Sequence, residues 1–369
     1  MRNFKIIICI LIYTLPGGTS LFSGNRYNNK DDNLDIFFAS KRDGYYGVYR
    51  SDSKNTQNIF TSCDILKRFP NMAKYQIAYS VSQDRRYVAF NALSESLDMD
   101  IFLHDLDTGK TQNLTQDLDT DTLPVLSHDG KWIAYLSHVK GGRNYDIVSV
   151  ISTDGLIKRR LTKNYTKIAT PSFSPDDREI LYVRYRPYHS AISIVDIETG
   201  WIQQLTSFSC SNQSPAFSTD GTKIVYASDC NGTFDIWMMN RDGSNNRLLY
   251  QSPGLEYDPH FTIDGKRVFF VSDWVAEKKE GKIGSAIISV NIDGDDPVNL
   301  LPKKYIQKDF FCFYPRSVGN GKALSFQGKV VKRFKSTQYS VYILDLENGN
   351  VRKIVNDEFN NTEPNVFIK

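Results

Sequence analysis

Histidine is the side chain most often used for proton transfer and metal binding near neutral pH, and this 369-residue chain has five of them. A metal centre needs several such groups together, often spaced as H-E-x-x-H or as paired C-x-x-C, and the chain contains neither spacing. His138, His189 and His260 are the best candidates to share one surface, but three separate stretches carry them. We therefore expect no catalytic residue and no metal or other cofactor.

Alternating carboxylates at residues 117–121, with the sequence DLDTD, are a second candidate for chemistry. A calcium-binding loop of the EF-hand type has a glycine at its sixth position and a glutamate at its twelfth. This stretch has Thr122 and His128 at those positions. The pattern favours a solvent-exposed loop over a calcium site.

The composition is that of a folded protein, with 40% hydrophobic and 24% charged residues. A formal net charge of +3 argues against a nucleic-acid binder, which is usually far more basic. Arg2 and Lys5 precede an apolar run at residues 6–15, which is too short for a membrane span of about 20 residues. We predict a signal peptide at residues 1–23 and a periplasmic or secreted protein, peripheral to the membrane at most; an uncleaved anchor is the alternative.

Any site must be positioned by the repeats that fill the rest of the chain. Each repeat begins with a strand, a polar turn and a second strand, as in PAFSTDGTKIVYAS from Pro215. A second half adds two more strands around another turn, as in DIWMMNRDGSNNRLLY from Asp235. Aspartate and glycine suit such turns because they tolerate positive φ. Four strands in a period of about 45 residues predict the blade of a β-propeller.

The repeats predict an all-β fold with seven four-stranded blades in a single domain at residues 34–369. The first blade lacks an innermost strand, and the end of the chain, EPNVF at residues 363–367, resembles the start of the other inner strands. We expect this C-terminal strand to close the ring, since an open edge strand is a liability. Six blades are the alternative if residues 302–355 are not a complete blade.

The motifs SPDD at 174–177, STDG at 218–221 and DIW at 235–237 resemble the repeats of TolB-type β-propellers. The resemblance covers residues 34–369 and implies an exported protein that binds a partner at one face of the ring. TolB proteins carry a small α/β domain before a six-bladed propeller, and we expect neither feature in this chain. Related blades occur in prolyl oligopeptidase-type peptidases, but we find no G-x-S-x-G motif in the sequence.

In a propeller blade, the loops before the inner strand and after the second strand lie on the same face, which we call the top face. Side chains at the starts of the inner strands meet there, at the mouth of the ring. We predict that partner binding uses this mouth, through the residues Asp121, Thr170, Gln213, Tyr257, Asp258 and Glu363 together with Lys332 and Arg333. The loops after the second strands also carry basic residues on this face, namely Lys140, Arg143, Arg184, Arg186, Lys278, Lys279 and Lys282. A basic rim of this kind attracts an acidic partner, although ordinary solvated lysine and arginine side chains are the alternative.

These features predict a monomeric, non-enzymatic scaffold that binds an envelope protein or peptide at the top mouth, with an acidic partner as one option, and no nucleic acid. A glycan-degrading lyase resembling oligogalacturonate lyase, with a metal in the channel, is the alternative. A structural envelope component without a soluble ligand is a third possibility.

Cysteines provide one more prediction, because the top loops of one blade contain both Cys210 and Cys230. Neighbouring strands are about 4.8 Å apart, which suits the Cα separation of about 5.5 Å in a disulfide. An exported chain meets an oxidising compartment, so we predict this pair, with two free thiols as the alternative. Cys63 and Cys312 are a weaker second pair.

Overall fold

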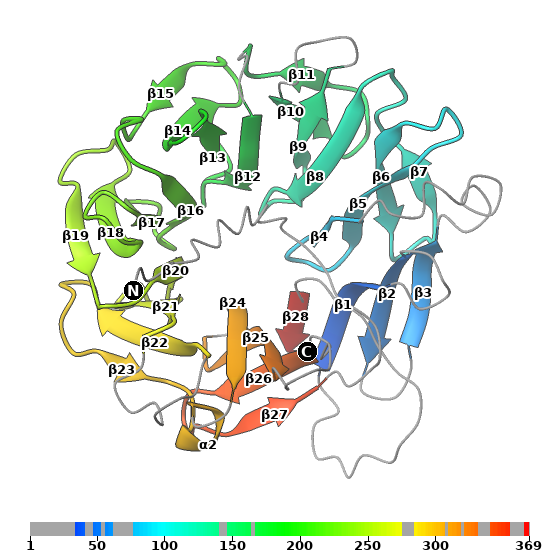
Figure 1. Cartoon of the computed structure of the whole chain (residues 1–369). Coiled ribbons are helices and arrows are strands. Elements are labelled where there is room, and N and C mark those ends of the chain that lie inside the picture. The colour runs from blue at the N-terminus through cyan, green and yellow to red at the C-terminus, as the bar shows by residue number, and fades with distance from the viewer. Residues whose placement is uncertain are drawn as a thin grey trace, which may run out of the picture.

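Seven four-stranded antiparallel sheets form a closed ring in the computed structural model of the chain (Figure 1). The prediction of an all-β, seven-bladed propeller is confirmed, and the six-bladed alternative is wrong. The structure describes residues 34–40, 47–52, 56–61, 77–139, 146–163, 167–274, 284–306, 309–318, 321–330, 340–354 and 365–368. The expected signal peptide at residues 1–23 lies outside them.

Within each blade, the four strands follow one another from the channel outward. Blade 1 contains β28 (Asn365–Ile368), β1 (Leu34–Ser40), β2 (Gly47–Asp52) and β3 (Thr56–Thr61). Blade 2 contains β4 (Tyr79–Val81), β5 (Tyr87–Leu93), β6 (Met99–Asp105) and β7 (Thr111–Asn113). Blade 3 contains β8 (Thr120–Leu126), β9 (Trp132–His138), β10 (Asp146–Ser152) and β11 (Lys158–Arg160). Blade 4 contains β12 (Lys167–Phe173), β13 (Glu179–Tyr185), β14 (Ser190–Asp196) and β15 (Ile202–Gln204). Blade 5 contains β16 (Asn212–Phe217), β17 (Lys223–Ser228), β18 (Asp235–Asn240) and β19 (Arg247–Tyr250). Blade 6 contains β20 (Glu256–Phe261), β21 (Arg267–Ser272), β22 (Ala286–Asn291) and β23 (Val298–Asn299). Blade 7 contains β24 (Phe310–Val318), β25 (Ala323–Val330), β26 (Ser340–Asp345) and β27 (Val351–Lys353). The short helix α2 (Lys303–Ile306) lies between these two blades in the chain.

The C-terminal strand closes the ring as predicted. Strand β28 pairs antiparallel with β1, from Leu34 opposite Ile368 to Phe37 opposite Asn365. The first and last parts of the chain thus share one sheet, which removes the free edge that the first blade would otherwise present to the channel.

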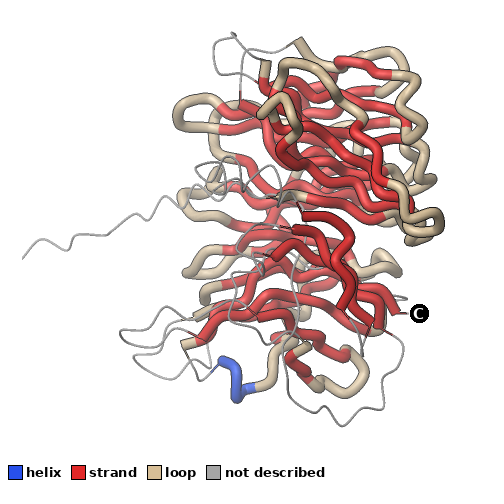
Figure 2. Tube along the Cα trace, turned by 90° about the vertical axis from the view of Figure 1, so that its right-hand side faces the viewer, coloured by secondary structure: helices blue, strands red, loops and turns tan. Residues whose placement is uncertain are grey.

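The turns between the inner and second strands are set by local side-chain chemistry. In blade 5, the Ser218 hydroxyl donates to Asp220 and accepts from the backbone N–H of Lys223, while Asp220 accepts from the N–H of Thr222. Gly221 then takes a left-handed conformation with φ of 70°. Blades 2, 3, 4 and 6 repeat this arrangement at Ser82, Ser127, Ser174 and Thr262. In the side view of Figure 2, strands run between two faces that carry these and the other loops.

Aromatic side chains fill the space between neighbouring blades. The fourth residue of each second strand from blade 2 to blade 7 is a fully buried aromatic, namely Phe90, Tyr135, Tyr182, Tyr226, Phe270 and Phe326. In blade 6, the turn between the third and fourth strands approaches the preceding blade closely, and a Cβ added at Gly294 would lie 2.1 Å from the carbonyl oxygen of Leu249. Large apolar groups therefore set the spacing between blades from inside, and at blades 5 and 6 a glycine at the turn also allows their close approach.

Candidate binding site at the mouth of the ring

Five of the inner strands share one backbone distortion. Each contains a β-bulge at an X-Pro step, and the residue before the proline has positive φ; these residues are Leu123, Thr170, Ser214, Asp258 and Tyr314, with φ between 48° and 55°. A bulge leaves a residue unpaired, which suits proline because it has no N–H to donate. Bulges also redirect side chains, and the inner strands surround the central axis (Figure 1).

Four of the predicted site residues belong to these bulges. Thr170 and Asp258 are the left-handed residues themselves, and Gln213 and Tyr257 stand where the pairing register shifts. Thr170, Gln213 and Tyr257 are half-buried, and the hydroxyl of Thr170 makes no hydrogen bond with any described residue. Backbone strain of this kind persists only where the surrounding structure enforces it, and it is common at ligand sites.

Asp258 links two blades across the wall of the channel. Its Oδ2 lies 3.2 Å from Nη1 of Arg316 in the next inner strand, and its Oδ1 lies 3.7 Å from Nε2 of His260. Burial opposes ionisation of Asp258, but the Arg316 guanidinium holds its pKa below the ordinary value. Burial lowers the pKa of His260, whose ring packs on Phe269 and is one quarter exposed. This is a charged cluster in which His260 is favoured in its neutral form.

Asp121 lies inside the wall rather than on the surface of the mouth. The residue is 0% exposed, and neither carboxylate oxygen makes a hydrogen bond to a described residue. Burial raises its pKa to about 6, although the nearby Ser137 and Thr115 hydroxyls partly offset the shift. A partner at the mouth therefore cannot touch Asp121 unless blade 3 opens.

Polar contacts join several blades to the next one near the top face. A residue at the start of a third strand, or directly before it, bonds to the backbone of the next inner strand at three interfaces: Asp146 accepts from the N–H of Ile168, Ser190 from that of Asn212, and Ser285 from that of Cys312. At the equivalent interface of blades 5 and 6, Asp235 faces Glu256, and each has a buried oxygen without a partner among the described residues. Burial raises both pKa values, and the negative charge of Asp235 raises that of Glu256 further.

The remaining predicted contact residues, Glu363, Lys332 and Arg333, lie outside the described residues. Their role at the mouth stays a prediction.

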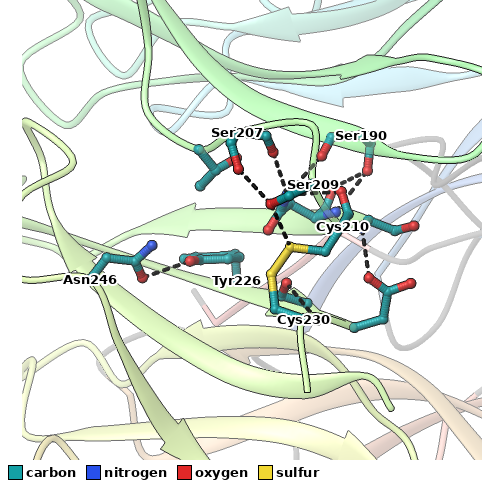
Figure 3. The surroundings of a disulfide bond; sticks show 12 residues. Ser190, Ser207, Ser209, Cys210, Tyr226, Cys230 and Asn246 are labelled. Carbon is teal, nitrogen blue, oxygen red and sulfur yellow. Dashed lines mark hydrogen bonds between the residues drawn. A yellow bond between two sulfur atoms is a disulfide. The ribbon is translucent and has the colours of Figure 1, made fainter. Parts of the chain in front are cut away.

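The structure joins Cys210 and Cys230 in a disulfide, with Cα atoms 5.1 Å apart (Figure 3). The loop before β16 is held further by hydrogen bonds around the bridge. The N–H of Ser211 donates to Asp229, and the Asn212 amide donates to the carbonyl oxygens of Ser190 and Ser207. Cys312 is a buried free cysteine, so the predicted pairing of Cys63 with Cys312 is wrong. Burial raises the pKa of the Cys312 thiol to about 12.

Beside this disulfide lies a surface that the repeat pattern does not reveal. Arg184 and Arg186 both lie over the ring of Phe208, with guanidinium carbons 5.4 Å and 4.1 Å from the ring centroid. Tyr188, in the same loop as Arg186, is 87% exposed. The two arginines were identifiable as top-face cations from the sequence, whereas Phe208 and Tyr188 carried no distinguishing signal.

The other candidates for chemistry have structural roles. Asp117 forms an ion pair with Lys158, and Asp119 forms one with Arg160. These two carboxylates of the DLDTD loop therefore bind strand β11. Within the described part of the chain, no three or more His, Cys, Asp or Glu side chains gather in a way that could hold a metal ion. No described helix has the length and apolar character needed to cross a membrane.

Comparison with known proteins identifies relatives of the repeats. Residues 139–283 match the family described as TolB beta propeller domain. An uncharacterized protein of Agrobacterium fabrum (strain C58) is 30% identical over 151 residues, covering 40% of this chain and 49% of that protein. The Tol-Pal system protein TolB of Bordetella pertussis (strain Tohama I) is 30% identical over 165 residues, covering 44% of this chain and 35% of that protein. The chain thus spans half or less of the length of these curated relatives.

Among solved structures, oligogalacturonate lyase from Vibrio parahaemolyticus has a similar fold. Its TM-score is 0.59 at 14% identity, and the match covers 89% of this chain and 87% of that one. Identity this low supports a shared fold and carries no information about chemistry, because the same propeller supports unrelated functions.

Proposed function

Because this chain belongs to the TolB-like β-propeller repeat family, we propose that it is an exported, periplasmic scaffold that binds a protein or peptide partner at the top mouth of its ring. The apolar leader at residues 6–15 supports export. The name of the Bordetella relative, a Tol-Pal system protein, supports a place in a protein assembly.

The observation that carries this proposal is the set of five bulged inner strands. Strained backbone recurs at one level of five different blades, around one axis. The half-buried Thr170, Gln213 and Tyr257 lie on these strands, and Gln213 offers an amide there. Few other surfaces of a propeller gather side chains from so many repeats, so a partner at the mouth contacts several blades at once.

The test places a photoreactive amino acid at Gln213 in the full chain, expressed in its native cells. Irradiation should produce a discrete protein adduct in the periplasmic fraction, identified by mass spectrometry, and N-terminal sequencing should show removal of the leader. The matched control is the same replacement at Gln112, an exposed glutamine of the outermost strand β7. A protein captured equally from both positions, or only from Gln112, would refute binding at the mouth.

A second comparison uses the same two positions without the crosslinker. Gln213→Arg should block recovery of the partner, whereas Gln112→Arg should leave it unchanged, since both add one charge but only one lies on an inner strand. Cleavage of oligogalacturonate by the purified chain would support the lyase alternative instead.

A further inference from the structure

Many of the described arginines form ion pairs with a carboxylate, unlike the two arginines on Phe208. Arg50, Arg160, Arg241, Arg267 and Arg316 each pair with a carboxylate. Neither Arg184 nor Arg186 has a carboxylate partner among the described residues. Two cations on one aromatic ring repel each other, so this arrangement is favourable for an incoming anion.

The hydrogen-bonding capacity of Arg184 is also only partly used. Its Nη1 makes a long contact of 3.4 Å with Gln204, and its Nε is buried with no acceptor among the described residues. A buried guanidinium N–H without an acceptor is costly. Planar guanidinium groups bind carboxylates through two parallel hydrogen bonds, which a point charge such as lysine cannot reproduce.

The surface is held in place by the disulfide loop. Phe208 stands between Ser207 and Ser209, whose hydroxyls are 2.6 Å apart, and Cys210 follows in the bridge to Cys230 (Figure 3). On the other side, the Ser211 hydroxyl donates to the carbonyl of Tyr188, which joins the two loops that carry the aromatic rings. Such preorganisation reduces the entropy lost when a ligand binds.

We propose that Arg184, Arg186, Phe208 and Tyr188 form a docking surface for a carboxylate-rich peptide segment of the partner. This inference rests on the proposed function and names the chemistry of the partner at the junction of blades 4 and 5. The two guanidinium groups bind acidic side chains, and the exposed Tyr188 ring covers an apolar side chain next to them. Tyrosine and arginine are the residue types that most often anchor protein interfaces, which favours a peptide over a glycan.

The experiment measures binding of a fluorescein-labelled peptide of glutamate and leucine by fluorescence anisotropy, using the disulfide-bonded mature chain. Arg184→Gln with Arg186→Gln should weaken binding at least tenfold. The matched control, Arg178→Gln with Lys266→Gln, removes two positive charges near the bottom turns and should change the affinity less than twofold. Arg184→Lys with Arg186→Lys should fall between the two, because the charge remains but the planar fork is lost.

Several outcomes would overturn the inference. They are no binding of the acidic peptide by the wild-type chain, equal weakening by both double variants, or binding of a poly-uronate oligosaccharide as tightly as the peptide. Thermal unfolding of each variant checks that the ring is intact. Capture of the partner from position Gln213 is scored in the same variants. If the Gln213 adduct persists when both arginines are replaced, the mouth function stands and the arginine surface is wrong; if it is absent from wild type, the proposed function itself fails.

Discussion

Asp258 of blade 6 and Arg316 of blade 7 form an ion pair of 3.2 Å between two bulges. Asp258 is the left-handed residue before Pro259, and Arg316 follows Pro315, which in turn follows the left-handed Tyr314. The same local distortion in neighbouring strands thus brings opposite charges together at the channel wall. The bulges that recur with the repeats therefore position the charged cluster at the mouth.

Two replacements of Asp258 should distinguish the energy of its ion pair from the energy of its backbone strain. Asn tolerates positive φ, so Asp258→Asn should lose only the charge interaction, about 2 kcal/mol of unfolding free energy, since Arg316 is one third exposed. Asp258→Ala should lose about 1 kcal/mol more, because alanine is strained in the left-handed region. Urea unfolding at pH 7 measures both values. Equal stability of wild type and Asp258→Asn would show that the pair contributes nothing.

Asp121 should make the ring less stable as pH rises. Its folded pKa of about 6 lies above the ordinary value of 3.8, so the folded protein holds a proton that the unfolded chain has lost between these values. Stability is therefore full below about pH 4 and falls as pH increases to 6. Asp121→Asn should be more stable than wild type at pH 7.5 by up to about 3 kcal/mol, and the gain should disappear near pH 4. Chemical unfolding across this range checks it; a pH-independent difference would contradict the raised pKa.

Gly294 should tolerate alanine much less well than Gly109, although both have positive φ. Alanine at Gly109 meets no atom within 4 Å, so only the backbone strain of about 1 kcal/mol applies. At Gly294 the added Cβ would lie 2.1 Å from the Leu249 carbonyl of the preceding blade, and the blades must separate. We expect a loss of at least about 3 kcal/mol for Gly294→Ala. Equal melting temperatures for the two variants would mean that the turn does not set the blade spacing.

Removal of the C-terminal strand should open the first blade. Deleting residues 362–369 removes β28, and the backbone groups of Leu34 to Phe37 lose their partners at the channel side of β1. A lower melting temperature and a broader transition are expected in thermal unfolding followed by circular dichroism. A truncated chain that melts at the wild-type temperature would disprove closure by this strand.

The Cys210–Cys230 bridge should stabilise the folded chain by about 3 kcal/mol, the chain-entropy value for a loop of about 20 residues. The double variant Cys210→Ser with Cys230→Ser should lose this amount in urea unfolding, and reduction of wild type should have the same effect. Non-reducing peptide mapping checks the pairing directly. A free thiol at Cys230 in exported material would contradict both the bridge and the interpretation of the leader.

The sequence by itself determined the architecture of this protein. Turn bonds such as Ser218 to Asp220 span two residues, and a left-handed glycine follows at once, so the hairpins are encoded locally. Repetition of that local signal predicted seven four-stranded blades, and the match between the chain end and the inner strands predicted closure by β28. The repeat pattern also placed Cys210 and Cys230 in top loops of one blade, and their pairing was predicted from that placement.

Only the tertiary structure decided which polar residues are exposed. The sequence placed Asp121 and Asp258 together at the mouth, but the first is sealed between blades and the second is committed to Arg316, 58 residues further along the chain. The stacking of Arg186 on Phe208 likewise depends on how loops from neighbouring blades meet. A repeat pattern specifies each blade, whereas burial and pairing at the interfaces arise from side chains that differ between blades and meet only when the ring closes.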